Sequence, residues 1–178
     1  TSQADTVLMP ALLQRPDVTC HFMTTIIDIP DNISKDLLEQ LLELIETGSQ
    51  VDPEGLEERI MNAELIALLV DNDKIVTTAT LKNPLTSYRN KVFKSAGVDN
   101  DKENYKKEIG YIVTHPDYEG KKLCQLLLNE FIPTVDRHNI FATTRKPSMA
   151  HILGKYGFKK AGITYNKDLD LFTYDGKK

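Results

Sequence analysis

Gly120, Lys121 and Lys122 stand directly before a leucine-rich segment whose apolar residues have helical spacing. The first turn of a helix offers unpaired backbone N–H groups and a partial positive charge, and both attract phosphate. A glycine at this point lets a bulky anion approach the backbone closely. The junction therefore fits a pyrophosphate, but a solvated turn explains the same residues, and a loop this short does not decide between the two.

The segments around this loop resemble the GCN5-related N-acetyltransferase (GNAT) superfamily. In that family a strand ends in valine and proline, and a glycine-rich loop then opens a helix and cradles the pyrophosphate of acetyl-coenzyme A. A second signature, roughly leucine-tyrosine-x-lysine-x-glycine-phenylalanine, closes a later helix. The positions that match the first pattern are Val113, Pro116, Tyr118, Gly120, Leu123, Leu127 and Leu128, and those that match the second are Ile152, Lys155, Gly157 and Phe158.

The resemblance implies an acyl-coenzyme A-dependent N-acyltransferase that moves an acetyl group to a primary amine by direct attack. The acceptor would be a small molecule or a protein lysine or N-terminus. The pantetheine arm would lie along the strand at Ile112, Val113 and Thr114, with one backbone N–H polarising the thioester carbonyl. The remaining positions expected to contact acetyl-coenzyme A are Glu119, Gly120, Lys121, Lys122, Leu123, Cys124 and Lys146.

The chain departs from the family pattern at several of these positions. Glu119 replaces the basic or amide residue that leads the loop, and Lys122 replaces its second glycine. The tyrosine that often protonates the leaving thiolate falls on Leu153, and the asparagine that often contacts pantetheine falls on Lys146. These departures favour an alternative, a catalytically degenerate module of the same fold that binds coenzyme A or a protein partner without turnover.

Glu108 stands where several family members keep a carboxylate base, and a base is useful because most amines arrive protonated. An exposed residue at the start of a strand is the other interpretation of Glu108. Tyr156 is the second catalytic candidate, although it lies three residues beyond Leu153, on a neighbouring face of its helix. His115 is better explained by packing at the helix start, and Cys124 by burial in the first helical turn.

The first two predicted helices usually line the acceptor side in this family. They carry a set of glutamates that would suit a cationic amine, but a solvated helix face explains them without any substrate and is the preferred interpretation. These residues are Glu39, Glu43, Glu46, Glu54, Glu57 and Glu58.

Hydrophobic periodicity and turn residues predict one mixed α/β domain over residues 19–178, preceded by an arm at 1–18. We expect a single, mostly antiparallel sheet of about six to seven strands with helices on both faces. The predicted strands are 20–29, 63–71, 74–82, 108–115, 139–145, 159–166 and 167–175, and the predicted helices are 32–48, 52–62, 120–132 and 147–158. The segment 84–107 is polar and poorly periodic, and we expect a flap or partner-binding arm over the acceptor site.

Composition narrows the functional classes. The 178 residues carry a formal charge of −4 without a basic block, which disfavours nucleic acid as a partner. Cys20 and Cys124 have no paired spacing, and the four histidines form no ligand pair, so we expect no metal site. No apolar run reaches membrane-spanning length. The two cysteines without paired spacing fit a reducing, cytoplasmic setting, which is the expected location. The sequence is compatible with a monomer or a homodimer.

Overall fold

The computed structural model describes residues 22–48 and 51–177. The expected arm at 1–18 and the start of the strand predicted at 20–29 lie outside these residues. Seven strands are present in the described part of the chain. They are β1 (Met23–Asp28), β2 (Leu65–Asp71), β3 (Lys74–Lys82), β4 (Lys107–Thr114), β5 (Ile140–Thr144), β6 (Lys159–Tyr165) and β7 (Leu169–Tyr174).

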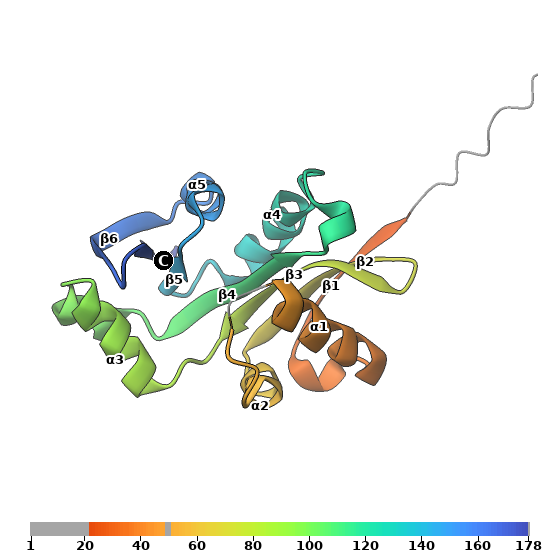
Figure 1. Cartoon of the computed structure of the whole chain (residues 1–178), viewed down its shortest axis with the longest axis horizontal. Helices are drawn as coiled ribbons and strands as arrows, with labels where there is room; N and C mark the ends of the chain where they lie inside the picture. The colour runs from red at the N-terminus through yellow and green to blue at the C-terminus, as the bar shows by residue number, and fades with distance from the viewer. Residues whose placement is uncertain (1–21, 49–50, 178) are drawn as a thin grey trace, which may run out of the picture.

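The strands form one open sheet in the order β1-β2-β3-β4-β5-β7-β6. All neighbours are antiparallel except β4 and β5, which are parallel. The β2–β3 hairpin turns at Asn72 and Asp73, both of which have positive φ, as their short polar side chains allow. The predicted fold class, a mostly antiparallel sheet with helices on both faces, is confirmed (Figure 1).

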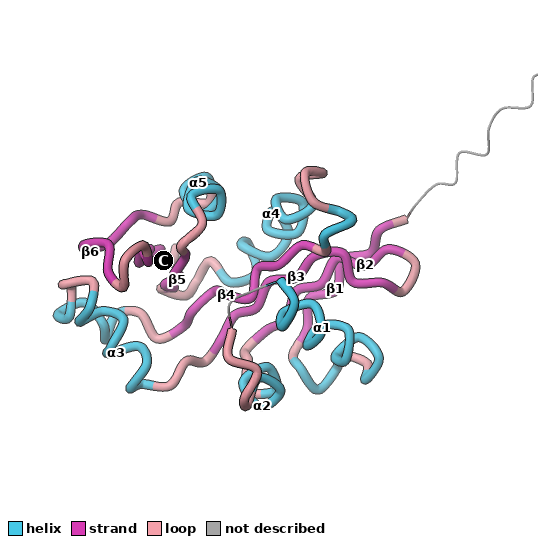
Figure 2. The backbone as a smooth tube through the Cα atoms, in the orientation of Figure 1, coloured by secondary structure: helices cyan, strands magenta, loops and turns pink. Residues whose placement is uncertain are grey.

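Helices cover both faces of the sheet. The α-helices are α1 (Lys35–Gly48), α2 (Leu56–Met61), α3 (Thr86–Ser95), α4 (Leu123–Val135) and α5 (Pro147–Lys155), and the short 3-10 helices are η1 (Pro30–Asn32), η2 (Asp99–Asn104) and η3 (Pro116–Tyr118). On one face α1 and α2 bury Leu41, Ile45 and Ile60 against β2 to β4. On the other face α4 and α5 bury Phe131 and Leu153. Figure 2 shows β1 to β4 as one layer between these two groups of helices.

Several predicted boundaries differ from the structure. The helix expected to end near Pro133 continues to Val135, with Pro133 inside its last turn. The helix predicted from residue 120 begins at Leu123, because Lys122 adopts a left-handed conformation that does not belong to a helix. Gly157, expected to end the helix at 147–158, has φ +89°, which suits the position after a helix end.

The segment 84–107 is more ordered than its sequence suggests. It forms α3 and η2 between β3 and β4. Val92, Phe93 and Ala96 are buried, and Phe93 makes an edge contact with Phe141 of β5 at 5.4 Å between ring centroids. The segment therefore covers the β5 side of the sheet, beside the part that α1 and α2 cover. The expected flap is a packed element, and Tyr88 is its one member that lines the cavity described below.

Among the described residues, no helix combines the length and the apolar character that crossing a membrane requires.

Candidate active site

The parallel strands β4 and β5 pair at two positions and then separate. Lys107 pairs with Ile140 and Glu108 with Phe141, whereas β5 stays paired with β7 along its whole length. From residue 109 onward, β4 therefore has no strand partner on its β5 side. An unpaired strand edge presents backbone N–H and C=O groups to a ligand.

A β-bulge reshapes β4 beside this gap. Thr80 pairs with Gly110 and Thr78 pairs with Val113, so two residues of β4 face one residue of β3. Tyr111 lies in the bulge with φ +49°, a conformation that a bulky side chain rarely adopts. A bulge re-aims side chains and strengthens the local twist, and both effects help β4 to diverge from β5.

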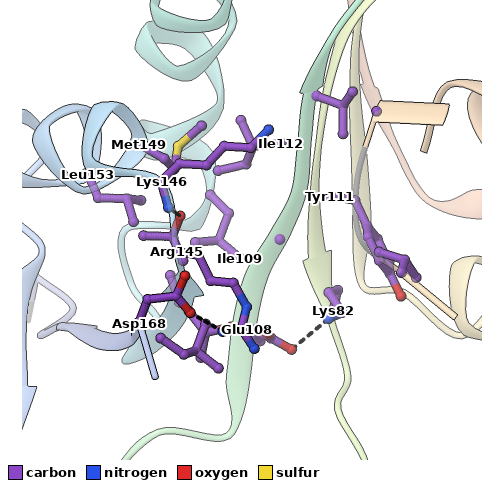
Figure 3. Close-up of a pocket in the computed structure, with 18 of the residues that line it drawn as sticks. Lys82, Glu108, Ile109, Tyr111, Ile112, Arg145, Lys146, Met149, Leu153 and Asp168 are labelled. Carbon is purple, nitrogen blue, oxygen red and sulfur yellow. Dashed lines mark hydrogen bonds and ion pairs between the residues drawn. The ribbon is translucent and has the colours of Figure 1, made fainter. Parts of the chain in front are cut away.

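A cavity of about 560 Å³ occupies the gap. This volume lies within the range of small-molecule sites, about 300–1,000 Å³. Its lining comes from both faces of the sheet: Ile109 and Leu153 belong to the core under α4 and α5, and Tyr111 and Val113 to the core under α1 and α2. The cavity thus passes the edge of β4 from one face to the other, and Figure 3 shows labelled residues on both sides of that strand.

Glu108 lies at the end of the cavity where the two strands part. It is 3% exposed, which excludes the interpretation of an exposed strand start. Its Oε2 lies 2.7 Å from Lys82 Nζ, and its Oε1 accepts a hydrogen bond from the Tyr88 hydroxyl at 3.2 Å. Figure 3 shows Glu108 and Lys82 joined across β4 and β3. Both carboxylate oxygens are therefore held by side chains from neighbouring elements.

Tyr88 is a site residue that sequence reasoning missed. Desolvation and the Glu108 carboxylate raise the pKa of its phenol, so the hydroxyl remains a donor at neutral pH. The apolar positions Val92, Phe93 and Ala96 have the helical spacing that could have revealed α3. Nothing in the sequence indicates that the first turn of that helix reaches Glu108.

The bend before α4 is exposed and left-handed at two positions. Gly120 has φ +75° and Lys122 has φ +59°. No side chain caps α4. Among the hydrogen bonds found in the described part of the chain, the amides of Lys122, Leu123 and Cys124 donate to no acceptor. Glu119 and Lys121, also expected to contact the coenzyme, are exposed on the same bend.

Cys124 is half-buried, and burial raises the pKa of its thiol to about 11. The thiol is therefore almost fully protonated at neutral pH and is not an activated nucleophile. His115 accepts a hydrogen bond from the Asp117 amide at its Nδ1, 3.2 Å away, and its ring contacts Tyr118. This arrangement agrees with a role in shaping the bend.

Lys146 and α5 form the wall opposite β4. Lys146 precedes α5, and its amide donates to Thr144 Oγ1 at 3.1 Å. In Figure 3 its side chain extends across the cavity toward Ile112. Met149 and Leu153 complete this wall, so an apolar side chain stands where the family pattern has a tyrosine.

Tyr156 is not brought into the cavity. Its hydroxyl donates to the Gln125 carbonyl at 2.9 Å and contacts Asn129 Oδ1 at 2.8 Å, and so it ties α5 to α4. It is not among the residues that line the gap, and Glu108 is not among its hydrogen-bond partners. The structure therefore brings only one of the two predicted catalytic residues, Glu108, to the cavity.

The charged lining of the cavity is mainly basic. The glutamates of α1, α2 and the loop between them are exposed and none lines the cavity, which favours their interpretation as a solvated face. Arg145 is paired with Asp168. The charged lining residues are Lys82, Glu108, Arg145, Lys146, Lys167 and Asp168.

A second cavity, of about 590 Å³, lies between β1, β2 and α1 and includes Thr24, Leu37 and Gln40. The Gln40 side chain is already engaged: its amide nitrogen donates to the Asp73 carbonyl, and its carbonyl oxygen accepts from the Ile75 amide. Size does not separate the two cavities, but the one at the β4–β5 gap combines an unpaired strand edge with a buried carboxylate.

No protein-family model matches the chain, and no curated protein sequence matches it. Solved structures do. Escherichia coli ElaA matches with a TM-score of 0.66 at 14% identity, covering 86% of this chain and 100% of that one. An acyl-CoA N-acyltransferase from Pseudomonas aeruginosa matches with a TM-score of 0.63 at 13% identity, covering 86% and 99%. A GNAT family acetyltransferase from Elizabethkingia anophelis with acetyl-CoA bound matches with a TM-score of 0.58 at 14% identity, covering 86% and 97%. The chain has the fold of the GNAT acetyltransferases.

Proposed function

We propose that the chain is an acyl-coenzyme A-dependent N-acyltransferase that transfers an acetyl group from acetyl-coenzyme A to a primary amine. The observation that carries this proposal is the cavity at the β4–β5 gap, with the buried carboxylate of Glu108 at one end. Such a cavity lets a donor lie on one face of the sheet while an acceptor approaches from the other.

The donor would be held by backbone groups and by positive charge. The pantetheine arm would pair with the free edge of β4 at Ile112, Val113 and Thr114, which lie beyond the last pairing with β5. The pyrophosphate would meet the unpaired amides at the start of α4, with Lys121 and Lys122 exposed beside them. Lys146 would reach the arm from the opposite wall. Bound acetyl-CoA in one structure of the same fold supports this choice of donor.

Glu108 would act as the base. A primary amine arrives protonated, and a carboxylate within hydrogen-bond reach removes that proton before attack. The nitrogen lone pair then attacks the thioester carbonyl, the C–S bond breaks, and the coenzyme thiolate leaves and takes up a proton. A backbone N–H at the bulge would stabilise the charge that develops on the carbonyl oxygen.

A non-catalytic binding module of the same fold is the second candidate. It is favoured by the apolar side chain of Leu153 in the α5 wall and by the engagement of Tyr156 with α4, which leave α5 without a tyrosine hydroxyl in the cavity. In that case coenzyme A binds at the same edge of β4 and no product forms.

Thermal unfolding with acetyl-coenzyme A, followed by assays on a panel of amines, tests both candidates. Ligand at about a hundred times its dissociation constant stabilises the folded chain by about 2.7 kcal/mol. Stabilisation with formation of an N-acetylated product and free coenzyme A supports the transferase. Stabilisation without any product across the panel supports the module, and no stabilisation contradicts both.

A further inference from the structure

Lys82 of β3 holds its amine inside the candidate active site. The side chain lies across Gly110, where an added Cβ would come within 3.0 Å of Lys82 Cδ. Its Nζ lies 4.5 Å from the centroid of the Tyr111 ring and 2.7 Å from Glu108 Oε2. The side chain is 17% exposed and lines the cavity. These contacts fix the amine next to the bulge in β4.

A general base must lie within hydrogen-bond reach of the proton that it removes. One oxygen of Glu108 meets the Lys82 ammonium, and the other meets the Tyr88 hydroxyl. Within the described part of the chain, Lys82 is the lysine whose ammonium group lies within hydrogen-bond reach of Glu108. The chain thus presents one of its own amines where an external acceptor would have to come.

We propose that Lys82 is a self-acylation site, on the basis of the proposed transferase function. Glu108 takes a proton from the Lys82 ammonium, and the Nζ lone pair attacks the thioester carbonyl. The C–S bond breaks, the thiolate leaves as coenzyme A with a proton, and Lys82 becomes an uncharged acyl-lysine. No oxidant or further reactant is needed. Fixing both groups in one cavity replaces an encounter in solution with an intramolecular step.

Acylation changes the site that performs it. An acyl-lysine carries no positive charge, so the Lys82–Glu108 ion pair is lost and Glu108 has hydrogen-bond donors, including the Tyr88 hydroxyl, but no counter-charge from Lys82. A buried carboxylate without its counter-charge is disfavoured. The modified chain is therefore expected to unfold at a lower temperature than the unmodified chain, and this provides a readout that does not depend on transfer to an external amine.

Lys107 offers a matched control. Its Nζ also lies 2.7 Å from a carboxylate, Glu64 Oε2, and its side chain is 23% exposed. It stands at the start of β4 but does not line the cavity. Lys82 and Lys107 are thus similarly buried, and each forms an ion pair with a carboxylate of its own. They differ in access to the proposed donor site.

The experiment incubates the whole chain with isotope-labelled acetyl-coenzyme A and measures acetylation of each lysine by mass spectrometry. We expect occupancy at Lys82 to exceed that at Lys107 by about a hundredfold, the scale of general-base catalysis. Excess unlabelled coenzyme A should suppress labelling of Lys82 and leave Lys107 unchanged. Glu108→Gln should slow Lys82 labelling by a similar factor, and the coenzyme A competition tests the proposal even if that variant folds poorly.

Equal labelling of Lys82 and Lys107, or labelling of Lys82 that coenzyme A does not suppress, overturns the inference. If acetyl-coenzyme A stabilises the chain and an external amine is acetylated while Lys82 stays unmodified, the inference fails and the transferase function stands. If acetyl-coenzyme A gives no stabilisation, both fail.

Discussion

Lys82 and Glu108 are directly opposite each other in the β3–β4 ladder, and their side chains form an ion pair with Nζ and Oε2 2.7 Å apart. Glu108 takes part in the last pairing between β4 and β5, so the ion pair lies at the start of the gap. The carboxylate is almost fully buried and the ammonium largely so. The candidate base, the opening in the sheet and an amine therefore meet at one point.

Replacing one member of this pair should lower the free energy of unfolding far more than replacing both. Glu108→Gln leaves a buried ammonium without a counter-charge, and we expect a loss of about 3 kcal/mol in the free energy of unfolding. The double variant Lys82→Met with Glu108→Gln should recover most of this loss. Chemical denaturation of the two single variants and the double variant measures the coupling. Additive losses would show that the ion pair does not govern the stability of this region.

Gly48 should be essential for the close packing of α1 against β4. A Cβ at this position would lie 2.2 Å from Val113 Cγ1, so Gly48→Ala forces the helix end or Val113 to move. We expect a loss of about 1–3 kcal/mol, typical of overpacking. Adding Val113→Ala should restore part of it.

Gly154 is the control for that prediction. It is exposed on α5, and a Cβ there would meet no atom within 4 Å. Gly154→Ala should raise the free energy of unfolding by about 0.5–1 kcal/mol, because alanine has the higher helix propensity. Similar effects of the two alanine substitutions in denaturant titrations would contradict the close packing of α1 on β4.

Tyr156→Phe should affect stability and leave the rate of acetyl transfer nearly unchanged. The lost hydroxyl bridges α5 to the Gln125 carbonyl, and such a hydrogen bond contributes about 1 kcal/mol. Steady-state kinetics and denaturation separate the two effects. A fall in kcat of about tenfold or more at constant KM, on the scale of acid–base catalysis, would instead support the catalytic role that the sequence suggested for Tyr156.

The free energy of unfolding should fall at alkaline pH because of Tyr165. Burial raises the pKa of its phenol to about 12, and its hydroxyl has no hydrogen-bond partner among the described residues. The unfolded chain releases this proton near pH 10 while the folded chain retains it, so stability falls as the pH rises from about 10 to about 12. Tyr165→Phe should reduce this slope and cost little at neutral pH. An unchanged slope in denaturation at several pH values would contradict the assignment.

The sequence predicted the elements whose signals are local. The β2–β3 hairpin follows from alternating apolar residues around a polar turn, and α4 from the leucine spacing after Lys122. The identity of Glu108 as a candidate base came from its place in a family pattern, but its burial depends on the β3–β4 register across a long connection. That register also pairs Lys82 with Glu108, which no short-range pattern could indicate.

The helix α3 was not predicted from the sequence, for a different reason. Its segment is rich in polar residues, because one face is exposed and the buried face has few apolar side chains, chiefly Val92 and Phe93. The catalytic role suggested for Tyr156 stays a prediction, but its hydroxyl lies against α4 and outside the cavity, because Tyr156 is three residues beyond the family position, on another face of α5. Spacing in a helix fixes which side chains share a face, but not which neighbour covers that face.

Hydrogen exchange with and without acetyl-coenzyme A tests the central claim most directly, because the claim concerns backbone amides. We expect slower exchange at residues 112–114 and at the bend and helix start, 120–125, with no change around Leu37 and Gln40 at the second cavity. Unchanged exchange in both segments at saturating acetyl-coenzyme A, or protection confined to the second cavity, would contradict a donor site at the β4–β5 gap.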